Sequence, residues 1–181
     1  MMRGLTLFDT QIGHCGIVWG ECGIVGVQLP EGSAQKTRSR LHRRFAEAQD
    51  ATPPQDVQAA IDAIIALLHG ESSDLSTIAL DMAQVPSFHR RVYEIARTIP
   101  CGATLTYGEI AQRLGDSTVA RAVGQALGKN PFAIIVPCHR VLAAGGKPGG
   151  FSANGGITAK LRLLSIEGVQ LNGTMTLFGP D

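Results

Sequence analysis

Residues 106–127 contain the start and stop signals of two short helices, and these signals restrict the fold more than any other segment. Thr106-x-x-Glu109 is a capping box, in which two side chains satisfy backbone N–H groups at a helix start. It predicts a helix that Gly115 ends, and Asp116 or Ser117 then caps a second helix. Two helices joined by a turn of about three residues containing Gly form a helix-turn-helix.

The second of these helices, expected over about 119–127, has two different faces. Gly128 closes it, and Arg121 lies off its apolar stripe, so we expect this side chain to face solvent or a ligand. Ala120 and Gly124, four positions apart, form a small face that another surface can approach closely. Helix packing and ligand contact both remain open for this face. The inward stripe consists of Val119, Ala122, Val123 and Ala126.

The first part of the chain carries strand signals followed by helix signals. Residues 4–29 alternate Gly with β-branched and other apolar residues, which predicts two or three short strands with a turn at Gly20–Gly23. Helices are expected over about 34–48 and 54–68, the second with an apolar face. Residues 69–86 are mixed in character and are expected to connect two subdomains.

The predicted fold class is α/β, more closely α+β. After the connection, Ser87 is expected to cap a helix that Pro100 ends. We therefore expect a small N-terminal domain of β-sheet and helices over residues 1–80. A mostly helical C-terminal domain with the helix-turn-helix follows over 86–170.

Basic residues are concentrated in the second half of the chain. Between Ser87 and Glu167 there are ten basic and four acidic residues, although the net charge of the chain is only +1. Such a segment suits contact with phosphate, and a coincidental surface distribution explains it equally well. No apolar run approaches the roughly 20 residues that span a bilayer, and no secretory signal is evident. We expect a cytoplasmic protein that makes no membrane contact.

Four cysteines are too widely spaced for a dense disulfide framework or a usual zinc site. We expect reduced thiols and no bound metal, as in an ordinary cytosolic protein. The four are Cys15, Cys22, Cys101 and Cys138.

The residues best suited to chemistry follow the apolar run 132–136, which we expect to be a buried strand or extended segment. Cys138 and His139 come directly after it and are the parts of an activated sulfur nucleophile. Because neighbouring side chains in an ideal strand point to opposite faces, the backbone after Pro137 must bend if the two are to cooperate. Glu167, at the end of the last predicted helix, is a candidate acceptor to orient the imidazole.

Five segments together resemble the family of O6-alkylguanine-DNA alkyltransferases, the methylated-DNA–protein-cysteine S-methyltransferases. Pro137–Val141 is similar to the active-site signature of the family, and Ala120–Gly124 to its recognition helix. Gly128–Pro131 resembles its asparagine hinge, Thr106–Ala111 the start of its helix-turn-helix, and Lys160–Glu167 its closing helix. The resemblance covers about residues 86–170 in order and spacing. The first half is compatible with the variable, ribonuclease-H-like α/β domain of the family.

This resemblance implies roles for four catalytic residues. Cys138 would accept an alkyl group from O6 of guanine, and His139 would deprotonate it through a water. Glu167 would orient His139. Tyr107 would help to rotate the nucleotide out of the helix and donate a hydrogen bond toward N3, which stabilises charge on the departing guanine.

The resemblance also implies how DNA is held. Because O6 is buried in duplex DNA, the base must leave the stack. Arg121 would enter the stack from the minor groove in its place, and the small face at Ala120 and Gly124 would let the helix approach a narrow groove. Asn130 would connect the helix-turn-helix to the active-site segment.

Further substrate contacts are implied at the end of the chain. Backbone groups of Cys138 and Val141 would contact the exocyclic amine of guanine, Ser152 would lie in the loop over the base, and Lys160 would belong to the substrate- or DNA-binding set. Phe151 stands where the family often has Tyr, so stacking would remain and a hydroxyl contact to O6 would be lost. The loop from Phe151 also has about two residues more than in some relatives.

The expected function is direct-reversal DNA repair by a single-use acceptor that needs no cofactor. Its partner would be double-stranded DNA with O6-alkylguanine, and O4-alkylthymine is an open question. We expect a monomer without an obligate protein partner. The alternatives are a non-catalytic alkylated-DNA binding protein, a transcription regulator and a cysteine hydrolase. The binder would transfer no alkyl group, the repair protein one for each chain, and the hydrolase would turn over repeatedly.

Overall fold

The computed structural model describes residues 2–171, so Met1 of the predicted N-terminal domain lies outside the described residues. Its first half contains a four-stranded sheet in the order β3-β2-β1-β4. The first three strands form an antiparallel meander, and β4 runs parallel to β1. The strands are β1 (Arg3–Thr10), β2 (Gly13–Gly20), β3 (Gly23–Gln28) and β4 (Ala48–Asp50).

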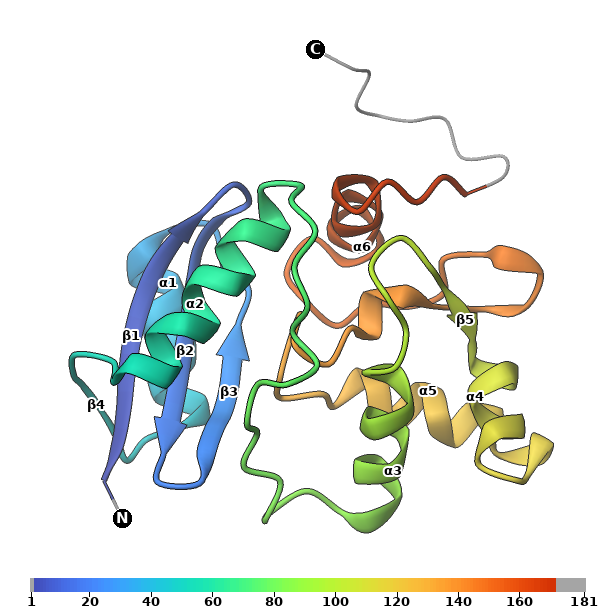
Figure 1. Ribbon diagram of the computed structural model, residues 1–181, viewed down its shortest axis with the longest axis horizontal. Helices are drawn as coiled ribbons and strands as arrows, with labels where there is room; N and C mark the ends of the chain where they lie inside the picture. The colour runs from blue at the N-terminus through green and yellow to red at the C-terminus, as the bar shows by residue number, and fades with distance from the viewer. Residues whose placement is uncertain (1, 172–181) are drawn as a thin grey trace.

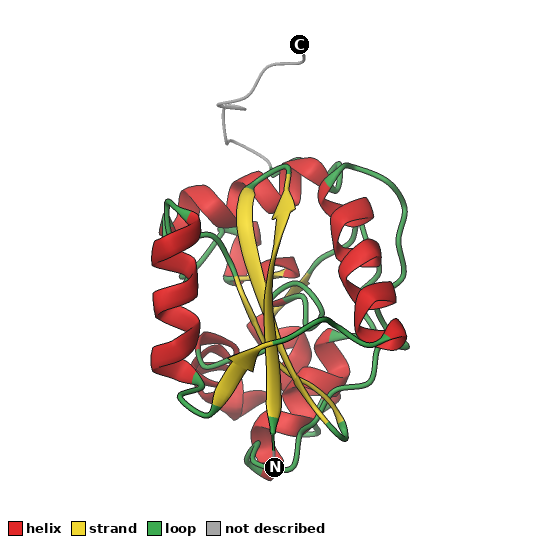
Figure 2. Cartoon of the chain, turned by 90° about the vertical axis from the view of Figure 1, so that its left-hand side faces the viewer, coloured by secondary structure: helices red, strands yellow, loops and turns green. Residues whose placement is uncertain are grey.

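Two helices cover opposite faces of this sheet, as Figures 1 and 2 show: α1 (Ala34–Arg44) and α2 (Gln55–Leu68). α1 packs closely against the sheet because the strand residues that face it include Gly16 and Gly26. A Cβ atom at these two positions would collide with Leu41 and Phe45, respectively. The predicted turn at Gly20–Gly23 is confirmed. The first helix was predicted to reach residue 48 but ends at Arg44, because the chain then turns into β4, a strand without an apolar alternation.

The second half is mostly helical: α3 (Ser87–Ala96), α4 (Tyr107–Arg113), α5 (Ala120–Gly128) and α6 (Gly156–Ile166). Two short strands, β5 (Leu105–Thr106) and β6 (Val141–Leu142), pair in parallel between them. The prediction that Ser87 caps α3 was wrong, since Pro86 is the N-cap residue and makes no side-chain cap bond. This helix also ends at Ala96, before Pro100. None of the described helices has the length and apolar character that a bilayer span requires.

The helix-turn-helix has the local structure that its sequence predicts. Thr106 Oγ1 accepts from the Glu109 backbone N–H at 3.1 Å, and the Glu109 carboxylate accepts from the Thr106 N–H at 2.6 Å. Gly115 has φ +90°, which favours glycine, and allows the chain to turn after α4. Asp116 caps the 3₁₀ turn Ser117–Val119 that leads into α5. The predicted α+β class is therefore confirmed.

Removing the capping hydroxyl should destabilise the protein measurably. In Thr106→Ala, the Glu109 N–H loses its acceptor at the start of α4, so we expect the free energy of unfolding to fall by about 1 kcal/mol. Urea unfolding followed by circular dichroism measures this. Ser117→Ala, at an exposed position of the following turn, is the matched control and should stay within about 0.5 kcal/mol of the wild type. Equal losses in the two variants would contradict the capping role of Thr106.

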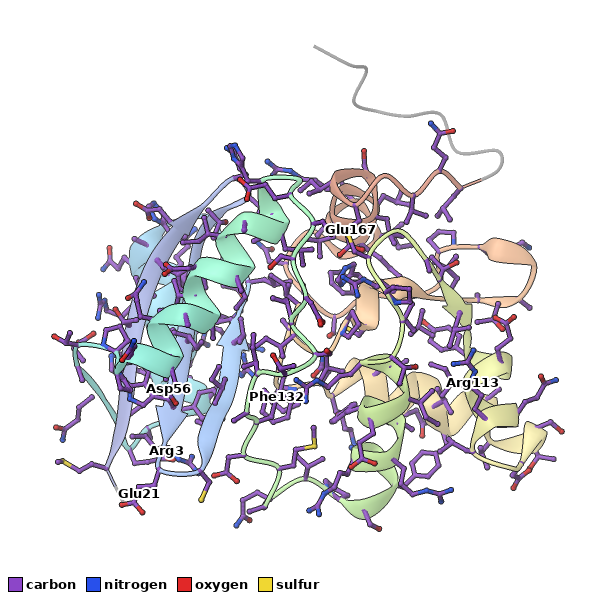
Figure 3. All side chains as sticks on the ribbon, in the orientation of Figure 1. Arg3, Glu21, Asp56, Arg113, Phe132 and Glu167 are labelled. Atoms are coloured by element: carbon purple, nitrogen blue, oxygen red, sulfur yellow. The ribbon has the colours of Figure 1, made fainter. Side chains whose placement is uncertain are left out.

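The two halves of the chain meet along β3. The connection after α2 is hydrogen-bonded to the start of β3, where Ile24 N–H donates to Ala79 O at 3.0 Å. Near its end, Val27 N–H donates to Pro131 O at 2.9 Å, so the segment before the predicted acceptor cysteine is tied to the sheet. Phe132 is fully buried between the sheet and the helices (Figure 3), in an apolar cluster that both halves share. The division into domains at 1–80 and 86–170 stays a prediction.

Candidate active site

The segment between α5 and the signature cysteine is buried, as predicted, but it is not a strand. Ile134 has φ +71°, a left-handed conformation that is uncommon for a β-branched residue, and Val136 N–H turns back to Phe132 O at 2.9 Å. Asn130 stabilises this turn from both sides: its Nδ2 donates to Val136 O and its Oδ1 accepts from Phe132 N–H, each at 2.9 Å. An apolar run that is buried in a turn has the same composition as a buried strand, which explains the wrong prediction.

Cys138, His139 and Arg140 form a 3₁₀ turn directly after this segment. The predicted bend is therefore present, and it sends the three side chains in different directions. Cys138 lines an open cavity, whereas His139 is 1% exposed and Arg140 is buried. All four cysteines are free thiols. Cys15 is buried in the sheet half, where burial raises its pKa to about 12. Among the described residues, Cys138 is the one cysteine that lines this cavity.

The Glu167 carboxylate is hydrogen-bonded to two basic side chains of this turn, His139 and Arg140. Glu167 follows α6 (Figure 3), and its side chain is 2% exposed. Its Oε1 lies 2.8 Å from His139 Nε2. Arg140 donates to both oxygens of the same carboxylate, at 2.8 and 2.9 Å, and to Ile99 O at 2.6 Å. A buried charge is tolerated when it is paired and hydrogen-bonded in this way.

Burial and this pairing together set the protonation states of the Glu167 carboxylate and the His139 imidazole. Burial alone would raise the pKa of Glu167, but the hydrogen bonds from His139 and Arg140 outweigh it and lower the pKa to about 2. Burial lowers the pKa of His139 despite its bond to Glu167, so the imidazole is neutral near pH 7. A neutral imidazole that donates from Nε2 to the carboxylate has a lone pair on Nδ1. That atom is buried and has no hydrogen-bond partner within residues 2–171.

The Cys138 thiol is held in its protonated form. Burial raises the pKa of Cys138 above its ordinary value, and the side chain of Asn130 and the charge of Lys160 oppose that rise. Little thiolate is therefore present until a proton acceptor removes the proton. Nearby, burial lowers the pKa of Lys160 to about 8.

A cavity of about 550 Å³ opens in front of the Cys138 sulfur, within the size range of small-molecule sites. α4 contributes Tyr107 to its wall, and burial raises the pKa of this phenol, which keeps it a hydrogen-bond donor. Seven residues predicted from the sequence line this one cavity: Tyr107, Ala120, Arg121, Gly124, Cys138, Phe151 and Ser152. Arg121 is exposed at the rim, as expected from its place on α5.

Lys160 packs against the loop 141–150, whose last residue lines this cavity, and is 1% exposed. Its Nζ donates to Val141 O at 2.6 Å and to Gly150 O at 3.3 Å, and lies 5.8 Å from the centre of the Tyr107 ring. Lys160 therefore joins the two ends of the loop and sits away from the surface. The Val141 carbonyl, a predicted substrate contact, already accepts this bond, although a carbonyl oxygen has two lone pairs.

Two features of the site were not predicted. Arg140 belongs to the signature motif, yet nothing in its sequence position indicates that it shares the carboxylate of Glu167. Gly149 approaches the Tyr107 ring so closely that a Cβ atom would lie 2.9 Å from the hydroxyl oxygen, and its φ of +69° favours glycine. The adjacent glycines Gly149 and Gly150 are the feature of the sequence that could have indicated such a close approach. Among the described residues, no group of His, Cys, Asp and Glu is arranged to hold a metal ion.

Comparisons with known proteins agree with this geometry. The family model described as "6-O-methylguanine DNA methyltransferase, DNA binding domain" matches residues 87–169. A methylated-DNA–protein-cysteine methyltransferase of Methanothermobacter thermautotrophicus is 37% identical over 158 residues, which is 87% of this chain and 81% of the relative. The chain belongs to the methylated-DNA–protein-cysteine methyltransferase family. Every residue of the cavity wall lies within the matched segment.

Solved structures show that the similarity of this chain to known methyltransferases includes the sheet half. The Mycobacterium tuberculosis OGT in complex with DNA superposes with a TM-score of 0.72, at 33% identity over 92% of each chain. The O6-methylguanine-DNA methyltransferase from the archaeon Pyrococcus kodakaraensis has a TM-score of 0.67 and 28% identity, covering 93% of this chain and all of that one. The methyltransferase family therefore shares both the sheet half and the helical half with this chain.

Proposed function

We propose that this chain repairs DNA by direct reversal, moving an alkyl group from O6 of guanine to Cys138 irreversibly and once for each molecule. The observation that carries the proposal is a thiol at the wall of a cavity large enough to admit a base, directly followed in sequence by a buried imidazole whose orientation a carboxylate fixes. The relatives named methyltransferases support the reaction, and the M. tuberculosis relative solved with DNA supports the partner.

The reaction needs one displacement and two proton transfers, one from the thiol and one to the departing guanine, which has no proton on N1 while O6 is alkylated. His139 Nδ1 takes the Cys138 proton, directly or through a water, while Nε2–H keeps donating its hydrogen bond to the Glu167 carboxylate. The thiolate attacks the alkyl carbon, so the S–C bond forms as the C–O6 bond breaks. The electron pair goes to the guanine, where the Tyr107 hydroxyl stabilises the developing charge near N3. A thioether product cannot be hydrolysed as a thioester can, so the acceptor is used once.

The base reaches the sulfur only after it leaves the duplex. Arg121 at the cavity rim is the side chain placed to fill the space in the base stack, and the small side chains at Ala120 and Gly124 let α5 lie close to the groove. The basic residues of the second half supply attraction to phosphate that does not depend on sequence. Phe151 in the cavity wall supplies a ring for stacking.

Loss of Arg121 should weaken base flipping without unfolding the protein. In Arg121→Ala the extruded state loses the side chain that replaces the base, so we expect the transfer rate at limiting protein to fall about tenfold or more. Fluorescence of 2-aminopurine beside the lesion reports flipping in the same samples. Arg113→Ala on α4 (Figure 3), exposed and absent from the cavity wall, is the control for general charge loss. Equal repair by the Arg121→Ala and wild-type proteins would reject the intercalation role.

Counting transfers separates the proposed function from its alternatives. Excess duplex with one O6-methylguanine is incubated with a known amount of protein, and repaired strands are counted over time. We expect a plateau at one repaired strand for each active chain. A non-catalytic binder would repair none, and a hydrolase would continue past one for each chain.

A further inference from the structure

A second cavity, of about 220 Å³, also borders Cys138. Its wall shares five residues with the cavity assigned to the base, so the two spaces are neighbours beside Cys138: Leu127, Gly128, Cys138, Phe151 and Ser152. The rest of its wall comes largely from the sheet half, including Gln28 of β3 and two arginines of α1. The second cavity is therefore an open side chamber beside Cys138, lined by both halves of the chain.

Positive charge predominates in this side chamber. Arg40, Arg44 and Lys129 line it, against a single carboxylate, Glu31. Within residues 2–171, Arg44 donates only to neutral acceptors: Gln28 Oε1 at 2.8 Å, Val27 O and Pro131 O, each of the last two at 3.3 Å. Burial lowers the pKa of Arg44, the nearby charge of Arg40 adds to this, and the charge of Glu31 opposes it.

The one acid does not neutralise these cations. Glu31 Oε1 lies 4.0 Å from Arg40 Nε, at the outer limit of an ion pair, and accepts a hydrogen bond from Gln28 Nε2 at 3.2 Å. An anion entering the chamber would meet two arginines and a lysine with one competing carboxylate. A carboxylate is a suitable anion, because it matches the planar donor array of a guanidinium group.

We propose that the side chamber receives the outer part of the alkyl group, and that it favours adducts ending in a carboxylate, of which carboxymethyl is the smallest. This inference rests on the proposed function. In a displacement, the sulfur, the reacting carbon and O6 lie in line, so a substituent on that carbon projects sideways from the line. A carboxymethyl group places three heavy atoms there, and the volume of the chamber accommodates them.

The chemistry is that of methyl transfer with a different group. The Cys138 thiolate attacks the CH2 carbon, the S–C bond forms, and the C–O6 bond breaks with its electron pair passing to guanine. The carboxylate is unchanged and stays beside Arg40 and Arg44 on an S-carboxymethyl cysteine. No oxidant, reductant or further reactant is needed.

The test compares three duplexes that differ only in the adduct: O6-methylguanine, O6-carboxymethylguanine and its neutral amide analogue, O6-carbamoylmethylguanine. Single-turnover rates are measured for the wild type and for Arg40→Gln and Arg40→Glu. The ratio of the carboxymethyl rate to the carbamoylmethyl rate, compared between proteins, cancels the different intrinsic reactivities of the two adducts. We expect this ratio to fall about two- to fivefold in Arg40→Gln, as for a partly exposed charge pair, and further in Arg40→Glu. Methyl transfer should be unchanged.

Arg38→Gln is the matched control, because this arginine of α1 pairs with Asp50 and does not line the chamber. It should leave the ratio at the wild-type value. An equal ratio in the Arg40 variants and the wild type would overturn the inference while the proposed function stands. Equal rate losses on all three duplexes would also overturn it, since Arg40 would then act on DNA phosphates. Absence of methyl transfer by the wild type would refute the proposed function itself, and the inference with it.

Discussion

Cys138→Ala should abolish alkyl transfer and leave binding to alkylated DNA intact. The substitution removes the sulfur that forms the new bond, and no other described cysteine lines the cavity. The contacts assigned to DNA, at Arg121 and along α5, are separate from the thiol. We therefore expect no detectable repaired strand, which is a loss larger than any other single change should cause. A gel-shift titration on the same duplex should give an affinity close to that of the wild type.

Cys101→Ala is the matched control for loss of a thiol. Cys101 is exposed and lies outside the cavity that holds Cys138. We expect full repair by this variant. Residual transfer by Cys138→Ala would show that another residue accepts the alkyl group, and loss of binding in a folded Cys138→Ala protein would show that the thiol contributes to recognition.

Glu167→Gln should impair both stability and transfer. The amide removes the charge that Arg140 and His139 share, which leaves a buried guanidinium without its counter-ion. Breaking one side of a buried ion pair costs about 3–5 kcal/mol, so we expect the free energy of unfolding to fall by that order. The Gln amide has one acceptor oxygen in place of two and no charge, so it orients the imidazole less firmly, and we expect the transfer rate to fall roughly 10²-fold. Rates should be measured at a temperature at which circular dichroism shows the variant to be folded.

The pH dependence of stability distinguishes this ion pair from simple packing. Because the pKa of Glu167 is lowered to about 2, its ionised form contributes stability fully above its ordinary pKa near 4.5. That contribution is lost as the pH falls from about 4.5 toward 2. Urea unfolding over this range should show a steeper decline for the wild type than for Glu167→Gln. Glu94→Gln, at an exposed position of α3, should keep the wild-type slope. Parallel curves for all three proteins would contradict the pairing.

Local signals in the sequence were enough to predict the elements that present the site. The capping box at Thr106 and the glycine turn at Gly115 depend only on residues a few positions apart, so their structure follows from nearby chemistry. The resemblance then assigned roles to seven of the residues that line one cavity. Those individual roles, from Tyr107 to Ser152, stay predictions until variants are measured.

Features that depend on distant partners could not be predicted in the same way. Arg140 joins Glu167 and Ile99, and these contacts exist only after α6 and the end of α3 have packed together. Arg44 reaches Pro131 across 87 positions of the chain. The turn at Ile134 depends on Asn130 bonding to both of its ends, whereas composition alone favours a strand. Long-range hydrogen bonds to backbone carbonyls leave little trace in sequence, because any residue supplies the acceptor.

The central claim is tested most directly by the intact mass of the protein after mixing with duplex DNA that holds one O6-methylguanine. We expect a gain of one methyl group for each chain, located by peptide mapping on the fragment with Cys138, and no second addition with excess DNA. An unchanged mass of the folded, reduced protein would contradict acceptor chemistry and favour a non-catalytic binder of alkylated DNA. A methyl group on another fragment would contradict the assignment of Cys138.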